Sequence, residues 1–300
     1  MNEQLISKRT LYTLIILTIV TISTLYIVYI VGKDTTIVFC DVGQGDASYI
    51  RVQNKIDILV DAGPDKKVLE CLGKYMPLFD RTIELAFITH PDKDHMKGFE
   101  YILDRYTVST IFLNPLQTST TFSRRIWQTI SDKKIKTVFP KSGTHISLLK
   151  SDIVFLWPQP EYLAANIAYD TNLIGTSITD TNSFSFIFEY KEDGIEVLYT
   201  GDANPLALSK VINSPFSGYA ERVSILKVPH HGSKNGLTAS FLELAAPTYS
   251  VISDGKKNSY GHPAKETLSL LSSHRTHILR TDQVGDIVFR IKKGRLQLSR

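Results

Sequence analysis

Cysteine is scarce in this chain of 300 residues, which contains only Cys40 and Cys71. Two cysteines exclude a framework of several disulfides and a four-cysteine zinc site. Both lie in apolar runs, which predicts small buried side chains, with a functional thiol as the alternative. The sequence also lacks internal repeats and low-complexity tracts, which argues against a repeat architecture and for ordinary globular folding.

An excess of charge of one sign is also missing. The chain has 34 basic and 30 acidic residues, a net charge of +4. This balance permits an anionic partner but does not by itself indicate a nucleic-acid-binding protein. The function therefore has to be sought in local motifs.

The N-terminus contains a long uncharged stretch, "LYTLIILTIVTISTLYIVYIV", at residues 11–31. A helix needs about 20 apolar residues to cross a bilayer, so we expect a single transmembrane anchor here. Two basic residues, Lys8 and Arg9, precede it, whereas the opposite charges of Lys33 and Asp34 after it cancel. Because positive charge favours the cytoplasmic side, we expect residues 1–10 in the cytoplasm and the rest of the chain outside it. A cleaved signal peptide is the alternative, but its apolar region is usually about 7–15 residues long, and no A-x-A pattern follows. A buried soluble helix is the third interpretation.

Short apolar strands and helical patterns follow one another after the anchor. The periodicity predicts a strand over 85–89, a helix over 96–106 and strands that end near residues 41, 200, 228 and 253. Residues 158–182 are rich in Pro, Thr, Asn and Asp, and we expect a long loop, either functional or disordered. The pattern indicates an α/β (α+β) domain of sheets covered by helices.

Residues with metal-binding side chains follow several of these strands. The stretch "THPDKDHMKG" contains His90, Asp92, Asp94 and His95 within six positions. Imidazole and carboxylate together suit zinc, manganese or iron. Further candidates follow other strands or lie in turns: Asp202 in "TGDA", His230 and His231 in "PHHGS", and His262 in "SYGHP". A lone histidine is more often a surface or core residue, and His145, His274 and His277, without supporting neighbours, are expected at the surface.

The motifs "FCDVGQGDASYI", "THPDKDHMKGFEYIL", "TGDA", "LKVPHHGS" and "NSYGHP", in this order, resemble the metallo-β-lactamase superfamily. More narrowly, they are similar to the hydrolase domain of the ComEC/Rec2 group of competence DNA-uptake proteins. The resemblance implies a four-layer αβ/βα sandwich over 35–300, with a site for two divalent metal ions, zinc or manganese, between its sheets. In "DVGQGD", Gly43 and Gly45 allow a tight turn. We expect Asp41 and Asp46 to support the site through hydrogen bonds, with direct binding of metal as the alternative.

The resemblance also implies roles for individual residues. His90 and Asp92 would bind the first metal, Asp94 and His95 the second, and Asp202 both. His231 or His230 would complete the second set, and we favour His231 as the ligand and His230 as a contact to the substrate. Many members supply a further histidine to the first metal, whereas the matching stretch "DTNSFSF" offers Asp180 or Asn182. An oxygen-rich first site favours manganese.

Catalytic roles are expected for Asp94, which would orient a water, and for His230 and His262, while Lys234 and Asn182 would contact the substrate. Lys97, Lys256 and Lys257 lie near the motifs and would attract phosphate or simply be solvated. Two metals about 3.5–4 Å apart activate a water for attack on a phosphoryl group. The resemblance therefore implies a membrane-anchored phosphodiesterase that acts on DNA or a cell-wall phosphodiester such as teichoic acid.

One anchor helix cannot conduct DNA, so uptake itself is not implied. The alternatives are a non-catalytic metal-binding module of a cell-surface complex and an anchored structural protein.

Overall fold

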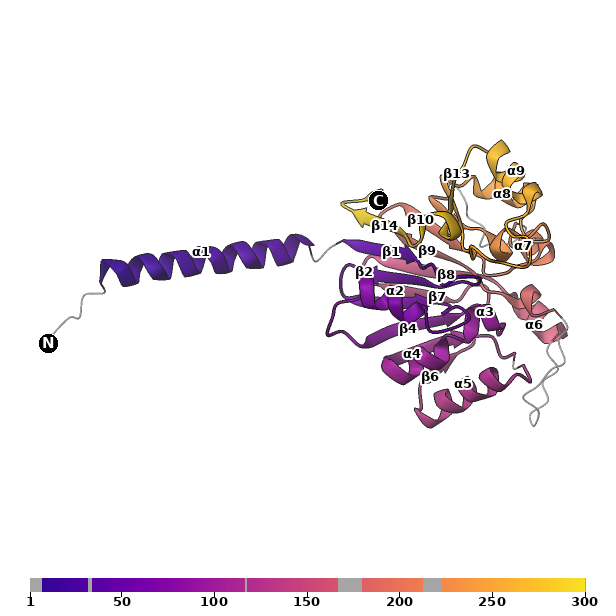
Figure 1. The fold of residues 1–300 in the computed structure, drawn as a ribbon, viewed down its shortest axis with the longest axis horizontal. Helices are drawn as coiled ribbons and strands as arrows, with labels where there is room; N and C mark the ends of the chain where they lie inside the picture. The colour runs from indigo at the N-terminus through magenta and orange to yellow at the C-terminus, as the bar shows by residue number, and fades with distance from the viewer. Residues whose placement is uncertain (1–6, 32–33, 117, 167–179, 213–222, 300) are drawn as a thin grey trace.

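The computed structural model of the chain describes residues 7–31, 34–116, 118–166, 180–212 and 223–299 (Figure 1). Residues 1–6 of the expected cytoplasmic segment and residues 167–179 of the expected loop lie outside these ranges.

Helix α1 (Lys8–Val31) contains the uncharged N-terminal stretch and stands apart from the rest of the chain in Figure 1. The hydroxyls of four threonines donate to the carbonyl four residues earlier, as in Thr18 to Leu14 and Thr21 to Leu17. These bonds satisfy the polar groups within the helix, so its surface is apolar. In the described part of the chain, α1 is the one helix long and apolar enough to cross a membrane.

Two sheets form the rest of the structure. The first has the order β15-β14-β1-β2-β3-β4-β5-β6, and the second β13-β12-β11-β10-β9-β8-β7. The strands of the first sheet are β15 (Arg295–Ser299), β14 (Ile287–Lys292), β1 (Thr35–Phe39), β2 (Ser48–Val52), β3 (Ile56–Val60), β4 (Thr82–Ile88), β5 (Thr107–Leu113) and β6 (Lys136–Val138). Those of the second are β13 (His277–Arg280), β12 (Tyr249–Ile252), β11 (Ile225–Lys227), β10 (Ile195–Tyr199), β9 (Ile187–Glu192), β8 (Ser151–Trp157) and β7 (His145–Leu148).

The sheets pack face to face, with helices on both outer faces (Figure 1). One core lies between the sheets and contains Ile50 and Phe188, among others. A second core joins the first sheet to α2 (Val68–Tyr75), α4 (Phe99–Arg105) and α5 (Thr121–Asp132). A third joins the second sheet to α7 (Pro205–Ile212), α8 (Ala239–Ala245) and α9 (Lys265–Ser273). Successive strand residues face opposite cores, as Tyr49 and Ile50 do, because side chains alternate along a strand. The four-layer sandwich is confirmed.

Two predicted elements were wrong in detail. The expected loop over 158–182 contains helix α6 (Pro160–Asn166), whose first residue is the proline that helix N-termini favour. The helix expected over 96–106 is divided into α3 (Lys93–Met96) and α4. Its hydrogen-bond ladder is interrupted because Gly98 N donates to Gly63 O, while Asp94 O accepts from Asp46 N. Both partners come from distant loops that local periodicity does not reveal.

Cys40 and Cys71 are both buried, as expected. They also form a disulfide, which links the end of β1 to α2 and which the sequence analysis did not predict. The bridge ties the loop that follows β1 to the helical layer outside the first sheet.

Candidate metal centre

The candidate residues gather at the edge where strands of both sheets end. His90 to His95 follow β4 of the first sheet, and Asp202 follows β10 of the second. Strands β10 and β11 run parallel, so their carboxyl ends meet at one edge. The short helix η2 (Pro229–Gly232) follows β11 and contains His230 and His231.

Asp94, His95, Asp202 and His231 form one group, in which one donor atom of each lies within 4.8 Å of the others. His95 Nε2 lies 3.1 Å from Asp202 Oδ1, and His231 Nε2 lies 3.4 Å from Asp94 Oδ2 and 3.5 Å from Asp202 Oδ2. Donors placed about 2.0–2.1 Å from one tetrahedral ion are about 3.4 Å apart. The spacing of the four side chains thus fits a single metal ion.

Burial supports the same interpretation. His95, His231 and Asp202 are at most 3% exposed. Among the described residues, His95 Nε2, His231 Nε2 and Asp202 Oδ1 have no hydrogen-bond partner. A buried polar atom without a partner is costly, so several that converge on one point indicate a ligand there.

The charges of the group favour a cation at this point. Burial alone lowers the pKa of His231, but Asp202 and Asp46 outweigh it and raise that pKa to about 10. Burial alone raises the pKa of Asp94, but His231 and His95 lower it to about 2. The same balance holds the pKa of Asp202 well below its usual range. The carboxylates therefore stay ionised and favour positive charge between them.

Both histidines of the group are oriented by an acceptor at Nδ1, the ring nitrogen that faces away from the metal group. His95 Nδ1 lies 2.8 Å from Asp61 Oδ2, and His231 Nδ1 lies 2.9 Å from the carbonyl of Ser253. An acceptor at Nδ1 keeps the proton there and leaves Nε2 free to bind metal. Asp61 is fixed in turn, because it accepts hydrogen bonds from the backbone N–H and the hydroxyl of Thr89.

A buried lysine lies on the Nδ1 side of these histidines. Lys227 Nζ is 2.5 Å from Asp46 Oδ2, and Asp46 Oδ1 is 3.5 Å from His231 Nδ1. Asp46, Asp61 and His95 form a second group that could hold a cation. Lys227 already supplies positive charge beside Asp46, so we interpret this group as support for His95 and His231.

The backbone of the "PHHGS" turn is unusual. His230 and His231 have φ values of 50° and 51°, a left-handed conformation that costs a non-glycine residue about 1–3 kcal/mol. The turn is held by bonds from His230 N to Gly201 O and from Ser233 N to His230 O. Of the two histidines, His231 belongs to the metal group, whereas His230 Nε2 lies 3.8 Å from Asp202 Oδ2 and is partly exposed.

His90 and Asp92 lie beside the four-residue group but outside it. His90 is buried, its ring centroid is 4.1 Å from that of His95, and its Nε2 lies 3.7 Å from Asp92 Oδ2. Thr181 lies in the stretch "DTNSFSF", and its hydroxyl donates a hydrogen bond to Asp92 Oδ1 at 2.7 Å. Within the described ranges, His90 Nε2 forms no hydrogen bond. Among the described residues, this pair belongs to neither group of side chains that could hold a metal ion.

The remaining candidates lie at different distances from the group. The ring of His262 is 5.6 Å from that of His230 and 6.5 Å from that of His231. Burial, and then the charges of His230 and His231, lower the pKa of His262. Asn182 Oδ1 is buried and has no hydrogen-bond partner among the described residues. Lys234 is exposed, and in the described part of the chain no hydrogen bond or ion pair joins its side chain to the metal group.

Sequence reasoning missed Asp61, Lys227 and Thr181. Two of them carried a signal. Asp61 directly follows a buried strand, as Asp202 nearly does, and Lys227 is a charged residue inside the apolar run "SILKVP". A lysine in such a run needs a buried partner. Thr181 had no comparable signal, because its contact depends on how two loops meet.

Comparisons with known proteins show the family of the chain. The family model described as the metallo-β-lactamase superfamily matches residues 40–253. ComE operon protein 3 of Bacillus subtilis is 25% identical over 84% of this chain and 32% of its own length. Recombination protein 2 of Haemophilus influenzae is 25% identical over 86% of this chain and 29% of its own length. The chain thus spans about a third of the length of these relatives.

A solved structure shows the same fold. The metallo-β-lactamase fold protein YhfI of Bacillus subtilis covers 86% of this chain and 100% of its own, with a TM-score of 0.54 and 14% identity. The family match includes the loops that carry His90 to His95, Asp202 and His231. The chain therefore belongs to the metallo-β-lactamase superfamily.

Proposed function

We propose that the chain is a membrane-anchored, metal-dependent phosphodiesterase. The observation that carries this proposal is the buried convergence of Asp94, His95, Asp202 and His231, whose donor atoms all lie within 4.8 Å of one another. A divalent ion held there would activate a water and polarise a phosphoryl oxygen. Zinc and manganese both suit such a mixture of imidazole and carboxylate.

The residues would divide the work as follows. Asp94 is partly exposed, so it would both hold the ion and orient the attacking water. His230 is also partly exposed, and its Nε2 faces the site, so it would donate a hydrogen bond to a substrate oxygen. His262 lies edge-on to His230, with ring centroids 5.6 Å apart, and would position it. His90 and Asp92, with Asp202, would hold a second ion, and Lys234 and Asn182 would contact the substrate farther out.

The substrate would be a phosphodiester in DNA or in a cell-wall polymer such as teichoic acid. Among the relatives, the name of one, Recombination protein 2, supports DNA. The chain spans about a third of those proteins, so their whole activity is not carried over.

The catalytic domain would lie outside the cytoplasm. Lys8 and Arg9 before α1 favour a cytoplasmic N-terminus. The Cys40–Cys71 disulfide supports the same orientation, since disulfides persist in oxidising compartments. Protease treatment of intact cells is expected to remove the domain. A domain protected until the cells are opened would contradict this orientation.

The test of the activity uses the full chain in detergent micelles, stripped of metal and then supplied with manganese or zinc. We expect cleavage of bis-p-nitrophenyl phosphate that depends on metal and is lost in Asp202→Ala. His145→Ala is the matched control, because His145 is exposed on β7 and its side chain contacts Asp152 on β8 of the second sheet. Activity that survives Asp202→Ala would reject the metal assignment. Metal binding without cleavage of any diester would instead favour a non-catalytic module.

A further inference from the structure

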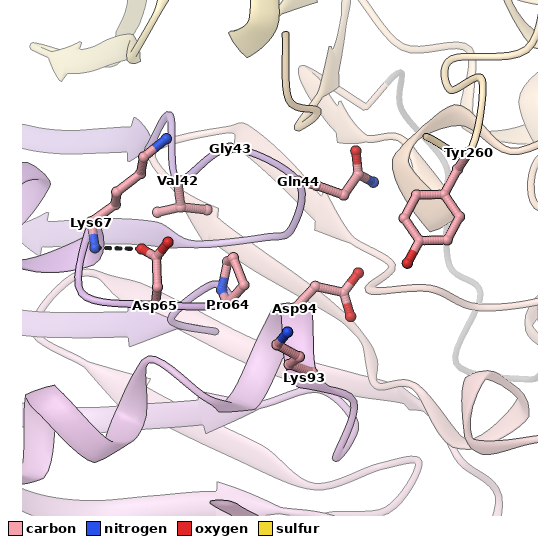
Figure 2. A pocket seen from close by; sticks show the side chains of 9 residues that line it. All are labelled: Val42, Gly43, Gln44, Pro64, Asp65, Lys67, Lys93, Asp94 and Tyr260. Carbon is pink, nitrogen blue, oxygen red and sulfur yellow. Dashed lines mark hydrogen bonds between the residues drawn. The ribbon is translucent and has the colours of Figure 1, made fainter. Parts of the chain in front are cut away.

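Two adjoining cavities open beside the metal group, on either side of the turn at Gly43 and Gln44. The first has a volume of about 300 Å³, and Asp94 and Tyr260 line it (Figure 2). The second has a volume of about 330 Å³ and extends along the loop after β12. Gly43, Gln44 and Lys67 line both, so the two cavities adjoin at this turn. We call the two cavities together the lysine trough, and its charged lining residues are Lys67, Lys93, Lys256, Lys257, Asp41, Asp65 and Asp94.

The trough carries four lysines. Lys67 and Lys93 line the first cavity, and Lys67, Lys256 and Lys257 line the second. All four are exposed, and within the described ranges none of the four ammonium groups takes part in an ion pair or side-chain hydrogen bond. Lys74 and Lys191, by contrast, are paired with carboxylates. The charge of the trough is thus available to a ligand.

Three aspartates also line the trough. Asp41 Oδ1 accepts a hydrogen bond from Gly43 N, and Asp65 Oδ1 accepts one from Lys67 N. Asp94 belongs to the metal group, where a cation would offset its charge. The four lysines outnumber the three aspartates, and with a cation at the metal group the lining would carry a net positive charge, which favours an anion with several spaced charges.

Close backbone contacts at two glycines hold the segments that line the trough against one another. A Cβ at Gly255 would lie 2.6 Å from Gln44 N, and a Cβ at Gly45, where φ is +142°, would lie 2.3 Å from Asp94 O. Both positions require glycine. The turn after β1, the loop after β12 and helix α3 are thereby fixed against one another, so the trough is built into the fold.

Tyr260 adds an aromatic surface at the end nearest the metal group. Its side chain is 70% exposed, and its ring stacks on that of His262 with centroids 5.8 Å apart. Figure 2 shows the tyrosine across the cavity from Lys67 and Lys93. An exposed ring beside a basic groove is the arrangement on which unpaired bases stack. A polymer of glycerol and phosphate has no such flat group.

We propose that the lysine trough and Tyr260 form a binding site for single-stranded nucleic acid, which leads the strand past Asp94. The backbone phosphates would lie along the four lysines, and one base would stack on Tyr260. The inference rests on the proposed phosphodiesterase and names the substrate it would bind.

The test measures binding of a labelled oligodeoxythymidine to the full chain in detergent micelles, at several salt concentrations. All proteins carry Asp202→Asn, so that the strand stays intact. Each phosphate contact on a single strand contributes about −0.7 to the slope of log affinity against log salt. We expect Lys67→Ala and Lys256→Ala each to reduce the slope by about 0.7. Lys150→Ala, in the turn between β7 and β8, is the matched control and should change nothing.

A second variant tests the aromatic contact. We expect Tyr260→Leu to weaken oligonucleotide binding about tenfold and to leave binding of poly(glycerol phosphate) unchanged. Unfolding midpoints verify that each variant folds. Salt slopes that are equal in Lys67→Ala, Lys256→Ala and the control would overturn the proposal. So would equal binding of both polymers without an effect of Tyr260→Leu, which would point to a cell-wall polymer.

The two proposals fail separately. The trough proposal alone would be rejected if the chain with Asp202 intact cleaves bis-p-nitrophenyl phosphate but oligonucleotide binding does not depend on the lysines. Lysine-dependent binding without cleavage under any metal supply would reject the phosphodiesterase and leave a nucleic-acid-binding surface.

Discussion

Lys227 Nζ lies 2.5 Å from Asp46 Oδ2, and both side chains are buried behind the histidines of the metal group. Removing one partner of a buried ion pair leaves the other charge without compensation. We expect Lys227→Met to lower the free energy of unfolding by about 3–5 kcal/mol. The double variant Asp46→Asn, Lys227→Met should cost less than the single change, because it removes both charges. Urea denaturation measures both, and a double variant that is as unstable as Lys227→Met or more so would contradict this account.

The disulfide makes a second, independent prediction. Cys40 and Cys71 are 31 positions apart, and closing a loop of that length stabilises a protein by about 3–4 kcal/mol. The double variant Cys40→Ala, Cys71→Ala is expected to lose about that much and to keep its metal content. Alkylation and mass spectrometry of the chain from its native membrane should find no free thiol. Two fully alkylated cysteines would contradict both the bridge and the oxidising compartment.

Metal affinity should depend on pH with a definite sign. Burial lowers the pKa of His231, but Asp202 and Asp46 raise it from 6.5 to about 10. Because the raised pKa belongs to the folded state, the stability that this proton contributes to the metal-free chain is present below about pH 6.5 and is lost as pH rises toward 10. A metal ion must displace the same proton.

Affinity is therefore expected to rise by about one order of magnitude per pH unit between pH ~7 and ~9, with at least one proton released per ion. Calorimetry in two buffers of different ionisation enthalpy counts that proton. Affinity that does not change over this range would show that His231 is not a ligand.

The sequence pattern predicted sheets covered by helices, and the family resemblance predicted the four-layer sandwich and the roles of the metal ligands. His90, Asp94, His95, Asp202 and His231 could be identified because each follows a predicted strand and carries a side chain that suits a metal. Parallel strands then bring their ends together at one edge. The assignment of Asp202 to the centre depended on the family resemblance, since one aspartate in a glycine-rich turn is not specific.

Other features depend on contacts between distant segments. The bond from Thr181 to Asp92 and the pair of Lys227 with Asp46 each join segments that are far apart in the sequence. The partners of Gly98 that divide the helix after β4 are of the same kind. The Cys40–Cys71 bridge likewise joins two layers. Periodicity reports which face of an element is buried, but not which loop covers it, so these contacts appear only in the folded chain.

The most direct test of the metal centre is the metal content of the full chain after stripping and resupply with manganese or zinc. Elemental analysis of the wild type should find bound metal, Asp202→Asn and His95→Gln should lose most of it, and His145→Gln should keep all of it. His145 is the matched control, because it is an exposed histidine with an aspartate partner outside the site. If Asp202→Asn and His95→Gln retain as much metal as the wild type, these side chains do not form a metal centre and the account is contradicted.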